Sequence, residues 1–114
     1  MQVDDIRIFI PCKNYEQSQR FYKALGFKIE DASNDLCVCT FGECTLFLQR
    51  YYNKTFAENL MLQLCVLNID EAYELISNLN GFDIRFEGIK RGRVELYGLK
   101  FVQSRGDLIA AQGL

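Results

Sequence analysis

The first apolar residues of the chain occupy every second position, which is the pattern of a β-strand. Ile6, Ile8 and Ile10 alternate with Arg7 and Phe9. Because successive side chains of a strand point to opposite faces, the three isoleucines are expected to pack beneath a helix while Arg7 and Phe9 face the other way. We therefore predict a strand over residues 6–10 with two chemically different faces.

A helix is predicted directly after this strand. Asn14 can cap its first turn, with Gln17 at the third position of a capping box, and Gly26 can take the left-handed conformation that ends a helix. The residues with helical spacing are Tyr15, Ser18, Phe21, Tyr22 and Leu25. Three further strands are expected at residues 27–32, 36–41 and 44–50, with turns at Asn34-Asp35 and Gly42-Glu43.

The second half of the chain repeats this order. Residues 6–29 align with residues 60–84, apolar positions falling on apolar positions, and residues 41–49 are echoed by residues 105–112. The expected elements are a strand at 60–66, a helix capped by Asn68 or Asp70 and ended by Gly81, and strands at 82–86, 94–103 and 108–111. The helix stripe consists of Ile69, Ala72, Leu75, Ile76 and Leu79, and the segments 52–59 and 87–93 are expected to be loops.

This repeat predicts an α+β fold made of two tandem βαβββ modules. Module one spans about residues 4–51 and module two about residues 60–112, within a single domain of residues 1–114. The two modules would form a curved mixed sheet around a cleft, with the helices outside. A cleft between the copies is the place where function is expected.

Composition and charge exclude several classes of partner. The net charge is −2 with acidic and basic residues interspersed, unlike the basic footprint of a nucleic-acid-binding protein. No apolar run approaches the ~20 residues of a transmembrane helix, and the first residues lack the basic start of a signal peptide. We therefore expect a cytoplasmic protein without a nucleic-acid or membrane partner.

The five cysteines form no CxxC pair. All lie in apolar, strand-like stretches, which favours reduced, buried thiols. A metal site at Cys37 and Cys39 is the alternative, although the chain offers it no second ligand pair and contains no histidine. The cysteines are Cys12, Cys37, Cys39, Cys44 and Cys65.

Two motifs resemble those of the vicinal oxygen chelate superfamily, which includes glyoxalase I, extradiol dioxygenases and the bleomycin and fosfomycin resistance proteins. Residues 18–27 match the family pattern S-x-x-F-Y-x-x-L-G-F, and residues 97–101 are similar to its aromatic-Gly-x-x-Phe segment. Where the family usually has Asp-Pro-Asp-Gly-Asn, this chain keeps only Gly106. The resemblance covers essentially the whole chain and implies the fold described above.

The resemblance also locates the four metal-ligand positions of the family. They correspond here to Arg7, Leu46, Met61 and Ala110. A permanent cation, two aliphatic side chains and a lone thioether cannot hold a hard divalent ion. We therefore predict no metal, no other cofactor and no catalytic residue, and expect binding without catalysis.

Strand alternation and the resemblance together select the residues expected to line the cleft. They are Arg7, Phe9, Leu46, Leu48, Arg50, Met61, Gln63, Cys65, Tyr97 and Ala110. Arg7 has two open interpretations: an anchor for an anionic group on a ligand, or a structural salt-bridge partner.

The leading functional hypothesis is a metal-independent protein that sequesters a small molecule in this cleft. One alternative is a lyase, isomerase or dioxygenase of the same superfamily, although the absence of histidine removes the usual nucleophile–base pairs. Another is a non-catalytic interaction module whose cleft is filled by its own side chains. A homodimer is expected, and the identity of the ligand stays open.

Overall fold

The computed structural model describes residues 1–60, 62–79, 81–82, 93–96 and 99–103. The chain divides into two compact units, Met1–Asn59 and Leu60–Leu114, and each is described by itself. No helix in the described ranges is long and apolar enough to cross a membrane.

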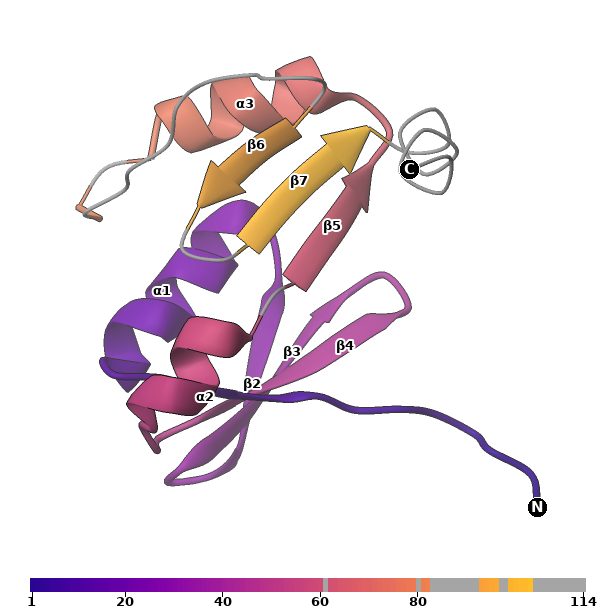
Figure 1. Cartoon of the computed structure of the whole chain (residues 1–114), viewed down its shortest axis with the longest axis vertical. Coiled ribbons are helices and arrows are strands. Elements are labelled where there is room, and N and C mark those ends of the chain that lie inside the picture. The colour runs from indigo at the N-terminus through magenta and orange to yellow at the C-terminus, as the bar shows by residue number, and fades with distance from the viewer. Residues whose placement is uncertain (61, 80, 83–92, 97–98, 104–114) are drawn as a thin grey trace. The chain divides into compact units, whose positions relative to one another are not determined.

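The first unit contains one four-stranded mixed sheet and two helices (Figure 1). In the sheet, β1 is parallel to β4, while β4 with β3 and β3 with β2 are antiparallel, giving the order β1-β4-β3-β2. The elements are β1 (Phe9–Pro11), α1 (Tyr15–Leu25), β2 (Lys28–Ser33), β3 (Leu36–Phe41), β4 (Cys44–Gln49) and α2 (Lys54–Asn59).

Helix α1 begins and ends at the residues that the sequence indicates. The Asn14 side chain accepts a hydrogen bond of 3.0 Å from the Gln17 backbone N–H, which satisfies a donor of the first turn. Gly26 ends the helix at φ 113°, a conformation that residues with a Cβ rarely adopt. The predicted helix and both of its limits are confirmed.

One face of the first sheet is buried against α1. The helix contributes Tyr15, Tyr22 and Leu25, and the sheet contributes Cys37, Cys39 and Leu48. Cys12 is buried with them and all three of these cysteines are free, as predicted for core thiols. Cys44 and Cys65 are exposed, so the prediction of burial is wrong for them.

The start of the first unit differs from the prediction. Strand β1 begins only at Phe9, and of the three isoleucines only Ile10 is buried, while Ile6 and Ile8 are exposed. The expected packing of Ile6 and Ile8 beneath a helix is therefore wrong. A second correction is α2, which occupies a segment predicted as a loop and begins where the Asn53 side chain accepts from the Phe56 N–H at 2.9 Å.

The described part of the second unit contains one three-stranded sheet and one helix. The strand order is β5-β7-β6, with β5 parallel to β7 and β6 antiparallel to β7. The elements are β5 (Leu62–Val66), α3 (Ile69–Ser77), β6 (Arg93–Leu96) and β7 (Leu99–Gln103).

Asn68 caps α3, accepting hydrogen bonds from the backbone N–H groups of Asp70 (2.9 Å) and Glu71 (3.2 Å). This settles the two predicted caps in favour of Asn68. The helix buries Ile69, Ala72 and Ile76, and leaves Leu75 exposed. It ends at Ser77 with Asn78 as its C-cap, so the predicted end at Gly81 is wrong and the helix is shorter than expected.

The predicted long strand over residues 94–103 is wrong, because this segment forms the separate antiparallel strands β6 and β7. Strand β7 lies beside β5 as β4 lies beside β1. The alignment of the two halves of the chain predicted that residues 108–111 would lie beside β5, and those residues lie outside the described part of the chain. The strand predicted at 82–86 also lies outside them, except for Phe82, which is in a bend.

Candidate functional site

The first sheet has a second face, which points away from the Cys37–Leu48 core. Residues paired directly across neighbouring strands point to the same side of a sheet. The register pairs Phe9 with Phe47 and Phe47 with Val38, and it places Gln49 beside Pro11 and Leu36. We call the face that carries these residues the open face.

An aromatic and cationic cluster lies on the open face. The rings of Phe9 and Phe47 meet edge to face, with centroids 4.8 Å apart, and the Arg7 guanidinium lies 5.5 Å from the Phe47 ring centroid. Phe47 is 8% exposed, whereas Phe9 is 40% exposed. Phe9 and Arg7 therefore form the accessible part of this cluster, which we call the Arg7 cluster.

Arg7 lies in solvent and is not the buried charge that the strand pattern indicated. Its Nε lies 3.3 Å from Oδ2 of Asp5, and the two side chains are 57% and 47% exposed. Arg7 thus has an acidic partner, but the pair is on the surface, and both interpretations of Arg7 stay open. The two terminal nitrogens of Arg7 make no hydrogen bond within the described chain, so they remain available to an anion.

Leu46 and Leu48 do not share a face with Phe9. Leu48 is paired with Ile10 and Cys37, and Leu46 with Cys39, so both point to the side that α1 covers. Since a shift of one residue moves a side chain to the opposite face, the predicted grouping is wrong by one position in β4. Phe47, with its neighbours Thr45 and Gln49, occupies the open face instead.

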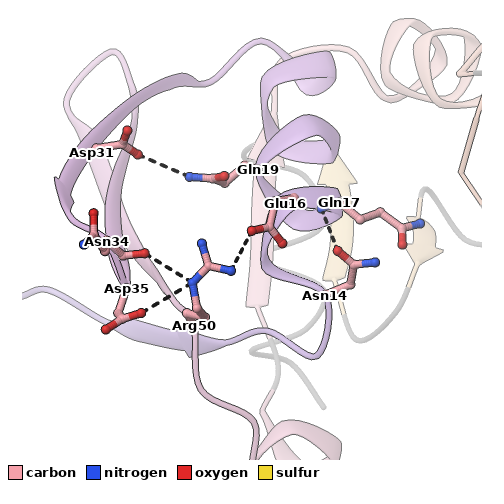
Figure 2. Close-up of polar contacts among 8 residues, drawn as sticks. All are labelled: Asn14, Glu16, Gln17, Gln19, Asp31, Asn34, Asp35 and Arg50. Carbon is pink, nitrogen blue, oxygen red and sulfur yellow. Dashed lines mark hydrogen bonds and ion pairs between the residues drawn. The ribbon is translucent and has the colours of Figure 1, made fainter.

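Arg50 follows β4 and belongs to a network at the start of α1 (Figure 2). Its Nη1 donates to Glu16 Oε1 at 2.5 Å, and its Nε donates to the Asn34 carbonyl at 3.2 Å and lies 3.4 Å from Asp35 Oδ1. The guanidinium also stacks over the Tyr15 ring, 4.4 Å from its centroid. The structure therefore separates Arg50 from the Arg7 cluster.

The hydrogen bond from Arg50 lowers the pKa of the Glu16 carboxyl. Burial raises the pKa of the Tyr15 phenol, and the neighbouring Cys37 thiol adds to this effect. Tyr15 is nearly fully buried, and its hydroxyl has no hydrogen bond of ordinary geometry in the described part of the chain. Sequence reasoning missed this network, because strand periodicity does not show which residues meet around a turn.

Fewer of the predicted site residues can be checked in the second unit. Gln63 and Cys65 are exposed while Leu62, Leu64 and Val66 are half-buried, so Gln63 and Cys65 share one face of β5, as predicted. Met61, Tyr97 and Ala110 lie outside the described residues. The binding roles predicted for all five stay predictions.

The residues of the open face do not fit a hard divalent metal ion. Arg7 carries a permanent positive charge, and the paired positions of β4 and β3 carry Phe47 and Val38. Glu30 is the partner of Val38 in β2, and its carboxylate is paired with Lys28 Nζ at 2.9 Å. Among the described residues, no three histidine, cysteine, aspartate or glutamate side chains could hold a metal ion together.

The buried thiols are poorly suited to nucleophilic chemistry. Burial raises the pKa of the Cys12 thiol, and burial together with the neighbouring Cys37 raises that of Cys39. Since the thiolate is the reactive form, both thiols are held in their unreactive state.

No protein-family model matches the chain, and no curated protein matches it. Solved structures do match. A bleomycin resistance determinant encoded on the transposon Tn5 has a TM-score of 0.69 at 17% identity, covering 90% of this chain and 99% of that one. A bleomycin-binding protein solved in complex with bleomycin has a TM-score of 0.65 at 16% identity, covering 90% and 100%.

A glyoxalase/bleomycin resistance protein/dioxygenase from Alicyclobacillus acidocaldarius has a TM-score of 0.62 at 16% identity, covering 93% of this chain and 95% of that one. At these identities the likeness shows the fold. It is the α+β fold of these bleomycin-resistance and glyoxalase-family structures. The resemblance predicted from residues 18–27 and 97–101 is confirmed at this level.

Proposed function

We propose that this chain is a metal-independent small-molecule-binding protein of the glyoxalase/bleomycin-resistance type, which sequesters its ligand without turning it over. The observation that carries the proposal is the Arg7 cluster, in which a cation with free donors lies over the Phe47 ring and Phe47 in turn contacts the accessible ring of Phe9. The fold supports it, because two proteins with this fold were solved with bleomycin or copper(II)-bleomycin bound.

The cluster favours a ligand that combines a planar ring with an anionic group. The exposed ring of Phe9 offers an apolar surface for stacking or edge-to-face contact. The terminal nitrogens of Arg7 can donate two parallel hydrogen bonds to a carboxylate or phosphate. Because the Asp5 pair is exposed to water, displacing it costs little when an anion binds.

Two features of the chain support sequestration without turnover. The chain contains no histidine, and the Cys12 and Cys39 thiols have raised pKa values. The four positions that correspond to the family's metal ligands carry Arg7, Leu46, Met61 and Ala110, whose side chains do not suit a hard cation, so the proposal includes no metal. Roles for Met61, Gln63, Cys65, Tyr97 and Ala110, a homodimeric state and a cytoplasmic location belong to the same proposal.

A thermal-shift screen of the purified protein tests this function. The panel pairs aromatic anions with matched controls: benzoate and phenyl phosphate against acetate, inorganic phosphate and phenol, with bleomycin as a separate probe. A bound ligand raises stability by mass action, by about 2.7 kcal/mol at one hundred times the dissociation constant.

We expect aromatic anions to raise the melting temperature more than either control class, and Arg7→Met to remove this rise. Equal shifts with phenol, or an unchanged response in Arg7→Met, would contradict an anion site at Arg7. If no compound of the panel has an effect on a folded protein, the proposal for this ligand class is wrong.

The filled-cleft alternative also has an observation in its favour. Phe47 is almost fully covered by its neighbours on the open face, as it would be in a module whose site is occupied by its own side chains. Such a module would give no saturable response to aromatic anions. It would be expected instead to bind a protein partner.

A further inference from the structure

A polar hollow lies on the α1 side of the first sheet, away from the Arg7 cluster. It has a volume of about 530 Å³ and opens between the start of α1 and the hairpin formed by β2 and β3. Asp31 is paired with Cys37, which places it on the same side of the sheet as α1. The lining residues are Tyr15, Glu16, Gln19, Asp31, Ala32, Ser33, Asn34 and Arg50.

Arg50 brings unused hydrogen-bond donors to this hollow. Its Nε and Nη1 bind Asn34, Asp35 and Glu16, but its Nη2 has no partner in the described chain. Figure 2 shows this third nitrogen, without a dashed line, directed into the space below Gln19 and Asp31. The contacts with Glu16 and the Tyr15 ring hold the guanidinium in place, so Nη2 is preorganised to donate.

Acceptors for a cation lie across the same hollow. Among the residues that the structure describes, the Asp31 carboxylate receives one long contact of 3.5 Å, from Gln19 Nε2, which leaves most of its acceptor capacity unused there. The Glu16 carboxylate accepts from Arg50 at Oε1, and its own backbone N–H also lowers the pKa of this carboxyl. The hollow is therefore lined by one guanidinium nitrogen that can donate a hydrogen bond and by two carboxylates that can accept further ones.

This distribution of charge selects among small ligands. A simple anion meets Nη2 but is repelled by Glu16 and Asp31, and a simple cation meets the carboxylates but is repelled by Arg50. A molecule that carries both an ammonium and a carboxylate satisfies both sides. Because like charges repel and opposite charges attract, the zwitterion is the favoured class.

We propose that the hollow binds a small amino-acid-like zwitterion, with its carboxylate on Arg50 Nη2 and its ammonium on Asp31 and Glu16. The site is independent of the Arg7 cluster, and its occupant needs no aromatic ring. Since the hollow is open to solvent, exposed ion pairs contribute modestly, and a dissociation constant of about a millimolar is expected.

Amide NMR titration of the whole chain tests this site. The probes are glycine, β-alanine and 4-aminobutyrate, which vary the spacing of the two charges, with acetate and ethylamine as single-charge controls at equal ionic strength. We expect at least one zwitterion to shift the amides of Ala32, Ser33 and Asn34 in a saturable way, and both controls to shift them little.

Asp31→Asn removes one ammonium partner while keeping the shape of the side chain, and Glu43→Gln makes the same change of charge in the distant Gly42-Glu43 turn. A lost charged hydrogen bond should weaken the binding of the zwitterion roughly tenfold in Asp31→Asn. Glu43→Gln should bind as the parent does. The proposal is overturned if no zwitterion shifts these amides, if acetate or ethylamine shifts them equally, or if both variants bind alike.

Discussion

The substitution Arg7→Met tests whether the ion pair between Arg7 and Asp5 lies on the surface or in the interior. The structure gives Arg7 two interactions, an exposed contact of 3.3 Å with Asp5 and a position 5.5 Å from the Phe47 ring centroid. An exposed ion pair contributes about 0–1 kcal/mol, and an exposed cation–π contact contributes about 0.5–1 kcal/mol. The thioether of methionine can contact the same ring, which recovers about 0.3–1.5 kcal/mol.

The expected loss in the free energy of unfolding is therefore below about 1 kcal/mol. For a domain of this size, that is a fall in melting temperature of roughly 4 °C or less. Urea and thermal unfolding of Arg7→Met measure both quantities. Asp5→Asn is the matched control, because it weakens the same ion pair while Arg7 stays over Phe47.

A loss of about 3–5 kcal/mol in Arg7→Met would refute this reasoning, because breaking a buried, desolvated pair costs that much. The same loss in Asp5→Asn would place the pair in the interior. Equal, small effects in both variants are the result expected from the structure.

Three further predictions concern two turn glycines, the Glu16–Arg50 pair and the cysteines. Gly26→Ala should destabilise the fold by about 1–3 kcal/mol in thermal unfolding, because φ is +113° and the new Cβ would lie 2.8 Å from the Phe41 ring. Gly42→Ala is the control: φ is +60° and nothing lies within 4 Å of the new Cβ, so the loss should be smaller, about 1 kcal/mol. Equal losses in the two variants would contradict this prediction. The lowered pKa of Glu16 means that its pair with Arg50 stabilises the fold above the ordinary glutamate pKa of 4.5 and is lost as the pH falls through the lower folded value. Glu16→Gln should flatten this acid-side slope in a pH series of melting temperatures, and an unchanged slope would count against the pair. Thiol titration with a disulfide reagent should show a fast and a slow group of cysteines, and a uniform rate would refute the assigned burial. The fast thiols are Cys44 and Cys65, and the slow ones are Cys12, Cys37 and Cys39.

Local signals in the sequence were sufficient for the first helix and its neighbours. Asn14 and Gly26 limit α1 because a side-chain cap and a positive φ are local requirements, independent of the rest of the fold. Strand β3 has the predicted limits, since turn residues flank it on both sides. The α+β class followed from the repeat and two motifs, and the likeness to solved structures agrees with that class.

Features that depend on contacts distant in sequence could not be derived in the same way. The face of Leu46 and Leu48 depends on the register between β4 and β1, and an alignment one residue off reverses it. The helix α2 is too short to have an apolar stripe from which a helix could be predicted. The Arg50 network joins the start of α1, the hairpin and the end of β4, three places that no local pattern connects.

The central claim, that a ligand binds on the open face beside Arg7, is tested most directly by methyl NMR with the strongest aromatic anion of the screen. Leu36 and Val38 carry their methyl groups on the open face, while Leu46 and Leu48 carry theirs toward α1. We predict saturable shifts of the Leu36 and Val38 methyl resonances that disappear in Arg7→Met, with Leu46 and Leu48 nearly unchanged. Shifts confined to Leu46 and Leu48, or shifts that persist in Arg7→Met, would contradict the claim.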